Sequence, residues 1–229
     1  MTKTAQESIY KNLRKMIIAG RLKPGDKIVE HSLAKKFGYS RVPVRESLIR
    51  LKAEGFVSSK ANKGFVVRRY SRQDVIELFE IRELVEVFAA GRAASFATED
   101  QKKDITKAHL SMMDFIERSE KSSEFVMEDK INSDLHFHSS IIDASNNSHL
   151  HETLQRTHRD QIFLFSPSVH TIEYWLNDTR EVFDIHDKIL KAIINHDPEE
   201  ARKYMSIHIK KACESSLKSL ETLSQDDFF

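Results

Sequence analysis

Four side chains of the types that bind divalent metals lie on helical patterns in the second half of the chain. Asp134 and His138 are four residues apart, so both lie on one face of a helix together with apolar residues. His186 and His208 each lie on the apolar stripe of a separate later helix. A buried carboxylate or imidazole needs a partner, because unpaired burial costs free energy. One shared divalent cation would satisfy all four groups.

Three imidazoles and one carboxylate are typical ligands of Zn²⁺, and also of Ni²⁺, Mn²⁺ or Co²⁺. The alternative is that the histidines are separate core residues, each with a local hydrogen bond. For any single histidine that alternative is the better interpretation. The set of four, which comes from three helices, favours a metal site with Zn²⁺ as the first candidate.

Arg82 is the second candidate for chemistry in this half of the chain, because it shares a helical stripe with apolar residues. An arginine on an inward face needs an anion, and its planar guanidinium fits a carboxylate. One interpretation is that Arg82 holds the carboxylate of a small effector whose other end binds the metal. The other interpretation, equally open, is an ion pair with Glu86 one helical turn later.

Three arginines near the N-terminus could read DNA. Arg41 and Arg45 are four residues apart and share a helix face, opposite the apolar residues Val44, Leu48 and Leu51. A guanidinium can make a bidentate contact to guanine in the major groove. Arg50 lies further along the same helix, where it would contact phosphate or pack its stem. The alternative for Arg45 is an ion pair with a neighbouring glutamate.

These arginines need a helix-turn-helix to present them to DNA. Helical periodicity and the end signals Gly20, Gly38 and Gly55 predict three helices, over 6–19, 30–37 and 40–55, the last capped by Ser40. Two short strands, over 56–59 and 64–68, follow and predict a hairpin wing. Lys63 in its polar loop is a phosphate-binding candidate. Gly64 would let the backbone approach a groove closely.

From Ser71 onward the pattern is helical throughout. The segment Ser71–Asp74 has the spacing of a capping box, and Asp197 followed by Pro198 is typical of a helix start. Periodicity predicts six helices, over about 71–97, 99–119, 123–145, 148–165, 171–196 and 198–222. The predicted fold is therefore mainly α, with a winged helix-turn-helix domain over 1–70 and an all-α six-helix bundle over 71–229.

The net charge also differs between the two predicted domains. The chain has 229 residues and a net charge of +1. Residues 1–70 contain 17 Lys and Arg against 5 Asp and Glu, whereas the remainder contains 19 against 30. A basic first third suits a polyanion such as DNA. The single cysteine excludes a disulfide framework, and with no signal core and no apolar run long enough for a bilayer we expect a cytoplasmic protein.

The chain resembles the GntR family of transcriptional regulators. The N-terminal resemblance is carried by Leu33–Ala34, Ser40–Leu51, Glu54–Gly55 and Lys63–Gly64. The bundle resembles the FCD effector domain of the FadR subfamily through Ile81–Glu86, Asp134–His138, Ile185–His186 and Met205–His208. About six bundle helices are more similar to the VanR-like branch than to the seven-helix branch.

The resemblance implies a homodimeric regulator that binds a double-stranded, pseudo-palindromic DNA operator and responds to a small organic acid. It also implies that Arg41 and Arg45 contact bases or phosphates, and that Gly64 at the wing tip enters the minor groove. We assign no catalytic residues.

Two other functional classes remain as alternatives. The first is a metal-dependent hydrolase with a DNA-binding domain, although the chain has no HExxH, P-loop or GxGxxG motif. The second is an architectural DNA-binding protein, which would not need a bundle core lined with polar groups.

Overall fold

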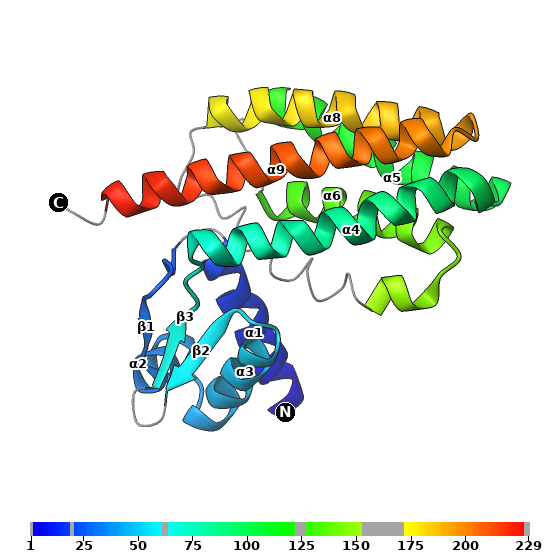
Figure 1. Ribbon diagram of the computed structural model, residues 1–229. Helices are drawn as coiled ribbons and strands as arrows, with labels where there is room; N and C mark the ends of the chain where they lie inside the picture. Colours follow the sequence, from blue (N-terminus) through cyan, green and yellow to red (C-terminus); the bar gives the residue numbers. More distant parts are fainter. Residues whose placement is uncertain (1, 19–20, 61–63, 122–126, 153–171, 227–229) are drawn as a thin grey trace. The chain divides into compact units, whose positions relative to one another are not determined.

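The computed structural model describes the chain except residues 1, 19–20, 61–63, 122–126, 153–171 and 227–229. The described residues fall into two compact units, one up to Ser71 and one from Arg72 onward. Figure 1 shows helices in both units and a small sheet in the first. The mainly α fold class, a winged helix-turn-helix followed by an all-α bundle, is confirmed.

The first unit is built on three helices, α1 (Thr2–Ile18), α2 (Glu30–Phe37) and α3 (Arg41–Ala53). Helix α1 packs on α3, and both contribute fully buried apolar residues, among them Ile9, Leu13, Val44, Leu48 and Leu51. Helix α2 ends at Gly38, whose φ of 71° is left-handed and favours glycine. Ser40 is the N-cap residue of α3, as predicted, but its side chain makes no capping hydrogen bond. The turn at Gly38 therefore sets the direction in which α3 leaves α2.

A three-stranded antiparallel sheet completes the first unit. The strands are β1 (Lys27–Ile28), β2 (Val57–Lys60) and β3 (Gly64–Val67), in the order β1-β3-β2. Val66 of β3 lies opposite Lys27 on one side and Ser58 on the other. The sequence predicted the hairpin of β2 and β3 but missed β1. Two residues are too short a segment to show the alternation by which strands are recognised.

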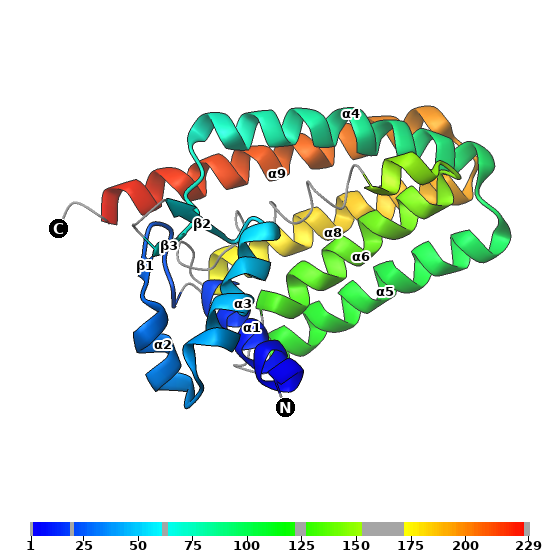
Figure 2. The ribbon, with the colours of Figure 1, turned by 90° about the horizontal axis from the view of Figure 1, so that it is seen from below.

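The second unit contains five long helices among its described residues. They are α4 (Arg72–Phe96), α5 (Glu99–Lys121), α6 (Met127–Ala144), α8 (Ile172–Ile194) and α9 (Pro198–Asp226). Residues 148–152 are also helical, whereas the rest of the helix predicted over 148–165 lies outside the described residues. Helix α4 packs along α9, and α5 packs along α6 (Figure 2). Among these described helices, none is long and apolar enough to cross a membrane.

Helices α5 and α9 begin with capping contacts, of which the one at Asp197 was predicted. The backbone N–H of Thr98 donates to the Gln101 side chain at 2.9 Å, and the N–H of Gln101 donates to the Thr98 hydroxyl at 3.2 Å, which is a reciprocal capping box. At the start of α9, the Glu200 N–H donates to Asp197 Oδ1 at 3.0 Å. These caps fix where α5 and α9 begin.

A candidate metal centre and a candidate DNA-binding face

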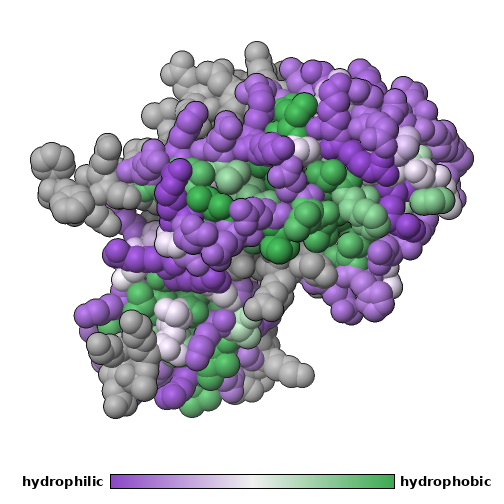
Figure 3. Space-filling model, in the orientation of Figure 1, coloured by the Kyte–Doolittle hydropathy of each residue, from purple (hydrophilic) through white to green (hydrophobic). Residues whose placement is uncertain are grey.

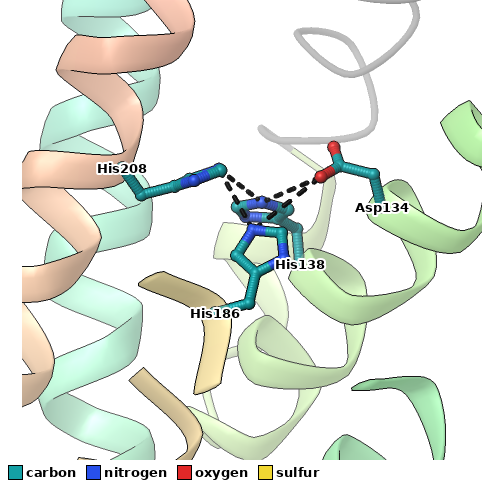
Figure 4. A group of neighbouring side chains, drawn as sticks. All are labelled: Asp134, His138, His186 and His208. Carbon is teal, nitrogen blue, oxygen red and sulfur yellow. Dashed lines mark hydrogen bonds and ion pairs between the residues drawn. The ribbon is translucent and has the colours of Figure 1, made fainter. Parts of the chain in front are cut away.

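Four side chains from three helices of the bundle converge on one point. Asp134 and His138 come from α6, His186 from α8 and His208 from α9 (Figure 4). The Nε2 atom of His208 lies 3.0 Å from that of His138 and 3.3 Å from that of His186. One oxygen of Asp134 lies 3.9 and 3.8 Å from the Nε2 atoms of His138 and His186. All four candidate ligand atoms lie within 4.8 Å of one another.

This spacing suits a single divalent cation. In a tetrahedral zinc site with Zn–N bonds of about 2.0–2.1 Å, neighbouring nitrogens are about 3.3 Å apart. The three imidazoles are almost fully buried, while Asp134 is partly exposed. Burial and the neighbouring imidazoles hold the pKa of His186 and His208 well below the ordinary value of 6.5. Both rings are therefore neutral at pH 7, the form that binds a metal.

Glu86 of α4 is a buried carboxylate that supports this cluster. Its Oε2 atom contacts Nδ1 of His138, and its Oε1 atom accepts a hydrogen bond from Arg82 Nε at 2.6 Å. A proton on Nδ1 of His138 leaves Nε2 with its lone pair directed at the other ligands. A carboxylate behind a metal-binding histidine is a recurring way of fixing the ring and its tautomer. The sequence indicated Glu86 only as a partner for Arg82, because spacing within one helix carries no sign of a contact with His138 on another helix.

Arg82 lies at the other end of this connection and is fully buried. The predicted ion pair with Glu86 is present, but it uses only Nε. Among the described residues, neither terminal nitrogen of Arg82 has a hydrogen-bond partner. A buried guanidinium with two unused donors is costly, and these donors have the geometry that binds a carboxylate. Thus both interpretations that the sequence left open for Arg82 are compatible with one structure.

Three other histidines in the described part of the chain make contacts of their own. His151 lies 2.8 Å from Asp143 on the surface. His196 lies 2.8 Å from the Lys102 ammonium and 3.1 Å from the Ala94 carbonyl. His109 is buried and stacks on Phe183 with ring centroids 4.2 Å apart. These contacts are local, and they serve as comparisons for the four convergent groups.

The exposed face of α3 carries two arginines and an apolar side chain in its first two turns. Arg41 is exposed and lies 3.4 Å from Glu30 of α2, an exposed ion pair of small energetic value. Arg45 is also exposed, and no ion pair joins it to a carboxylate in the described part of the chain. Val42 between them is 61% exposed. Val42 was not among the residues predicted to contact DNA, but an exposed apolar group on a recognition helix can contact the methyl group of thymine.

The other residues predicted to contact DNA are Arg50, Lys63 and Gly64. The Arg50 guanidinium is held by Glu7 at 2.7 Å and Glu54 at 3.1 Å, and it lies over the Tyr10 ring at 3.6 Å. Arg50 therefore joins α1 to α3, and its contact with DNA stays a prediction. Lys63 lies outside the described residues. Gly64 begins β3 with a φ of 74°, in the left-handed region that a side chain disfavours.

Two family models match this chain. The model for bacterial regulatory proteins of the gntR family matches residues 5–67, which hold the helix-turn-helix and the sheet. The model for the FCD domain matches residues 77–211, which hold Arg82, Glu86 and the four convergent side chains. Together the two matches account for most of the chain.

Individual relatives agree with these matches. The chain is 29% identical over 209 residues to an uncharacterised HTH-type regulator, YdhC of Bacillus subtilis, covering 90% of this chain and 88% of YdhC. It is 30% identical over 219 residues to the HTH-type regulator LutR of Bacillus subtilis, covering 85% of this chain and 93% of LutR. The solved structure of Escherichia coli McbR/YncC has the same fold, with a TM-score of 0.70 at 21% identity, covering 94% of this chain and 98% of that chain.

Proposed function

Because the chain belongs to the GntR family of bacterial regulatory proteins and carries an FCD domain, we propose that it senses a small carboxylate at a metal centre and so controls its own binding to operator DNA. The observation that carries this proposal is the placement of four convergent ligand atoms beside a buried arginine with two unused donors. The unused donors of Arg82 are costly to bury, so they favour a ligand that pairs with them.

The metal-binding and anion-binding roles fall to different residues in this proposal. Asp134, His138, His186 and His208 hold the cation, with Zn²⁺ as the first candidate and Ni²⁺, Mn²⁺ or Co²⁺ as the others. The bound cation supplies a positive centre at which a carboxylate can bind in a poorly hydrated site. The terminal nitrogens of Arg82 donate to the same ligand, so that the anion has two cationic partners.

The chain offers a direct route from this site to the DNA-binding unit. Helix α4 carries Arg82 and Glu86, and it begins five residues after Val67, the last residue of β3. A ligand that binds better to one position of α4 than to another would shift the population of that position. The DNA-binding unit is attached to the end of α4, so its orientation would change with it.

On the DNA side, we propose that Arg41 and Arg45 contact bases or phosphates in the major groove. Val42 adds an apolar contact, and Lys63 and Gly64 approach the DNA from the wing. One such unit reads few base pairs, so two copies on a pseudo-palindromic operator give the needed specificity. The relatives named above are regulators, and no enzymatic activity is shown for this chain, so we assign the metal to ligand binding rather than to hydrolysis.

The decisive experiment is metal analysis of the full chain purified without a chelator. We expect about one divalent metal ion per chain. The His186→Ala variant should lose most of that metal and unfold at a lower temperature, because the remaining buried groups lose their shared partner. The control is His151→Ala, which removes an exposed histidine outside the cluster and should keep both the metal and the stability.

Two results would contradict the metal proposal. One is a parent protein that binds no Zn²⁺, Ni²⁺ or Mn²⁺ even after these ions are added. The other is equal metal content in the parent, His186→Ala and His151→Ala. In either case the histidines would be a hydrogen-bonded core group, and DNA binding would have to be controlled elsewhere.

A further inference from the structure

An open pocket of about 560 Å³ lies at one end of the bundle, where α8 turns into α9 (Figure 1). The face of that end seen in Figure 3 is mostly hydrophilic. We call it the lysine pocket after Lys102, Lys103 and Lys107, which line it from the first half of α5. The other wall is the end of α8, where Ile194 comes eight residues after His186, or about 12 Å along the helix. The pocket is therefore separate from the candidate metal centre.

Lys102 is a buried cation that its neighbours hold in place. It is 6% exposed, and its ammonium donates to Glu99 at 2.7 Å and to Nε2 of His196 at 2.8 Å. An ammonium has three donors and no acceptor. Nε2 of His196 therefore accepts, and its Nδ1 donates to the Ala94 carbonyl at 3.1 Å. Among the described residues these contacts use two of the three donors of Lys102, so one donor is left for a ligand.

The pocket is positive although the unit that contains it is acidic. Residues 71–229 contain 19 Lys and Arg against 30 Asp and Glu, whereas the pocket has three lysines against Glu99 alone. Lys103 is paired with Asp100 at 2.9 Å, but that ion pair is exposed and of small energetic value. In the described part of the chain, no ion pair joins Lys107 to a carboxylate. The lining thus has an excess of two positive charges, which favours an anion.

The lysine pocket also has an apolar part. Leu110 of α5 is 59% exposed and Ile194 of α8 is 43% exposed, and both line the pocket. Lys103, Lys107 and Leu110 are spaced four and three residues apart, so they form one row along α5. The leucine lies about 5–10 Å along the helix from the two lysines. A ligand that fills the pocket therefore needs an anionic group at one end and an apolar body at the other.

We propose that the lysine pocket binds a small organic phosphate, with the phosphate at the lysines and the apolar body over Leu110 and Ile194. A phosphate monoester carries about −1.5 to −2 charges at pH 7, which matches the excess positive charge of the lining. Lysine binds phosphate as a point charge, whereas a planar carboxylate is better matched by arginine, which is absent from this lining. The volume is in the range of small-molecule sites. This site goes beyond the proposed function, because it uses none of the candidate metal ligands and not Arg82.

The test is isothermal titration calorimetry of the full chain with phenyl phosphate, a probe that has both parts. We expect a Kd of about 1 mM or below. Lys107→Gln should weaken binding by about 10-fold or more, because a hydrogen bond to a charged group is lost. Lys203→Gln is the matched control, since Lys203 is an exposed lysine of α9 that pairs with Glu200 outside the pocket. Leu110→Ala should weaken phenyl phosphate but leave the affinity for inorganic phosphate unchanged.

A bound metal ion can also attract phosphate, so the titration is repeated on parent protein from which a chelator has removed metal and has then been dialysed away. Phenyl phosphate should bind this protein as tightly as before. Binding that is lost with the metal would assign the phosphate to the metal centre and overturn the proposal. No binding to the parent, equal binding to Lys107→Gln, or equal loss in Lys203→Gln would overturn it as well. Metal content is measured separately, so a failure of the lysine pocket is distinguishable from a failure of the metal centre.

Discussion

At the scale of single residues, Glu86 connects two features that the sequence treated separately. It bonds Arg82 through one oxygen and His138 through the other. Loss of the positive charge of Arg82 would therefore also affect the ring that carries a candidate metal ligand. Truncation of Arg82 to alanine would leave Glu86 short of a buried partner, so a conservative substitution is the better probe of ligand binding.

Glu86→Gln tests the positioning role of this carboxylate. The four candidate ligands remain, but a neutral amide holds the His138 ring less firmly in the required tautomer. We expect the affinity for Zn²⁺ to fall by about 10- to 100-fold, as for other residues behind metal ligands. Competition with a chromogenic zinc chelator measures this change. Glu83→Gln is the control, because Glu83 lies on the same helix but bonds Ser206 and Lys210 instead. Equal affinity in the Glu86→Gln variant and the parent would remove Glu86 from the site.

The buried histidines also predict how stability depends on pH in metal-free protein. The pKa of His186 and His208 lies well below 6.5 in the folded chain because of burial and neighbouring imidazoles. The unfolded chain therefore binds more protons once the pH falls below about 6.5. The free energy of unfolding should decrease as the pH falls from 7 to 5. Urea titrations at several pH values measure it, and the decrease should be smaller in His186→Ala.

At the scale of elements, α3 contains residues with different tasks. Arg45 is exposed and has no ion pair to a carboxylate in the described part of the chain, whereas Arg50 bonds Glu7 and Glu54 and lies over Tyr10. We expect Arg45→Ala to weaken specific operator binding by roughly 1–3 kcal/mol without a change in unfolding temperature. Arg50→Ala should instead lower the free energy of unfolding by about 1 kcal/mol. Mobility-shift and thermal-unfolding measurements on both variants separate the two roles. Unchanged operator affinity in Arg45→Ala would mean that another face reads the DNA.

Lys63, in the loop of the wing, is predicted to affect DNA binding without affecting sequence specificity. Lys63 is expected to bind a phosphate, which carries no sequence information. Lys63→Ala should weaken binding to operator and to random duplexes by similar factors. It should also reduce the slope of log K against log salt by about one. A loss confined to the operator would assign Lys63 to base reading.

At the scale of the whole molecule, the proposed effector response would depend on Arg82 of α4 together with the four candidate metal ligands. Arg82→Lys keeps a positive charge beside Glu86 but loses the planar pair of donors that fits a carboxylate. This variant should keep its metal, while small organic acids should no longer change its operator affinity. The measurement is a mobility-shift titration with a panel of such acids, using the parent as reference. A full response in Arg82→Lys would place the effector elsewhere.

The sequence by itself determined the architecture. Helical periodicity, the end signals and the charge difference between residues 1–70 and the remainder were enough to predict the winged helix-turn-helix and the all-α bundle. The same periodicity placed Asp134, His138, His186 and His208 on inward faces, because one face of an amphipathic helix is fixed by its apolar spacing. The sequence could not show β1, whose two residues have no pattern of their own.

Only the tertiary structure decided which inward faces meet. The distances among the imidazoles depend on the packing of α6, α8 and α9, and the contact of Glu86 with His138 depends on the register of α4 against α6. Neither follows from spacing within one helix, because residues that are distant in sequence become neighbours only when helices pack. The branch of the FCD family stays a prediction, since residues 153–171 lie outside the described part of the chain. The lysine pocket also depends on the tertiary structure, because its walls come from α5 and from the end of α8, which are distant in the sequence.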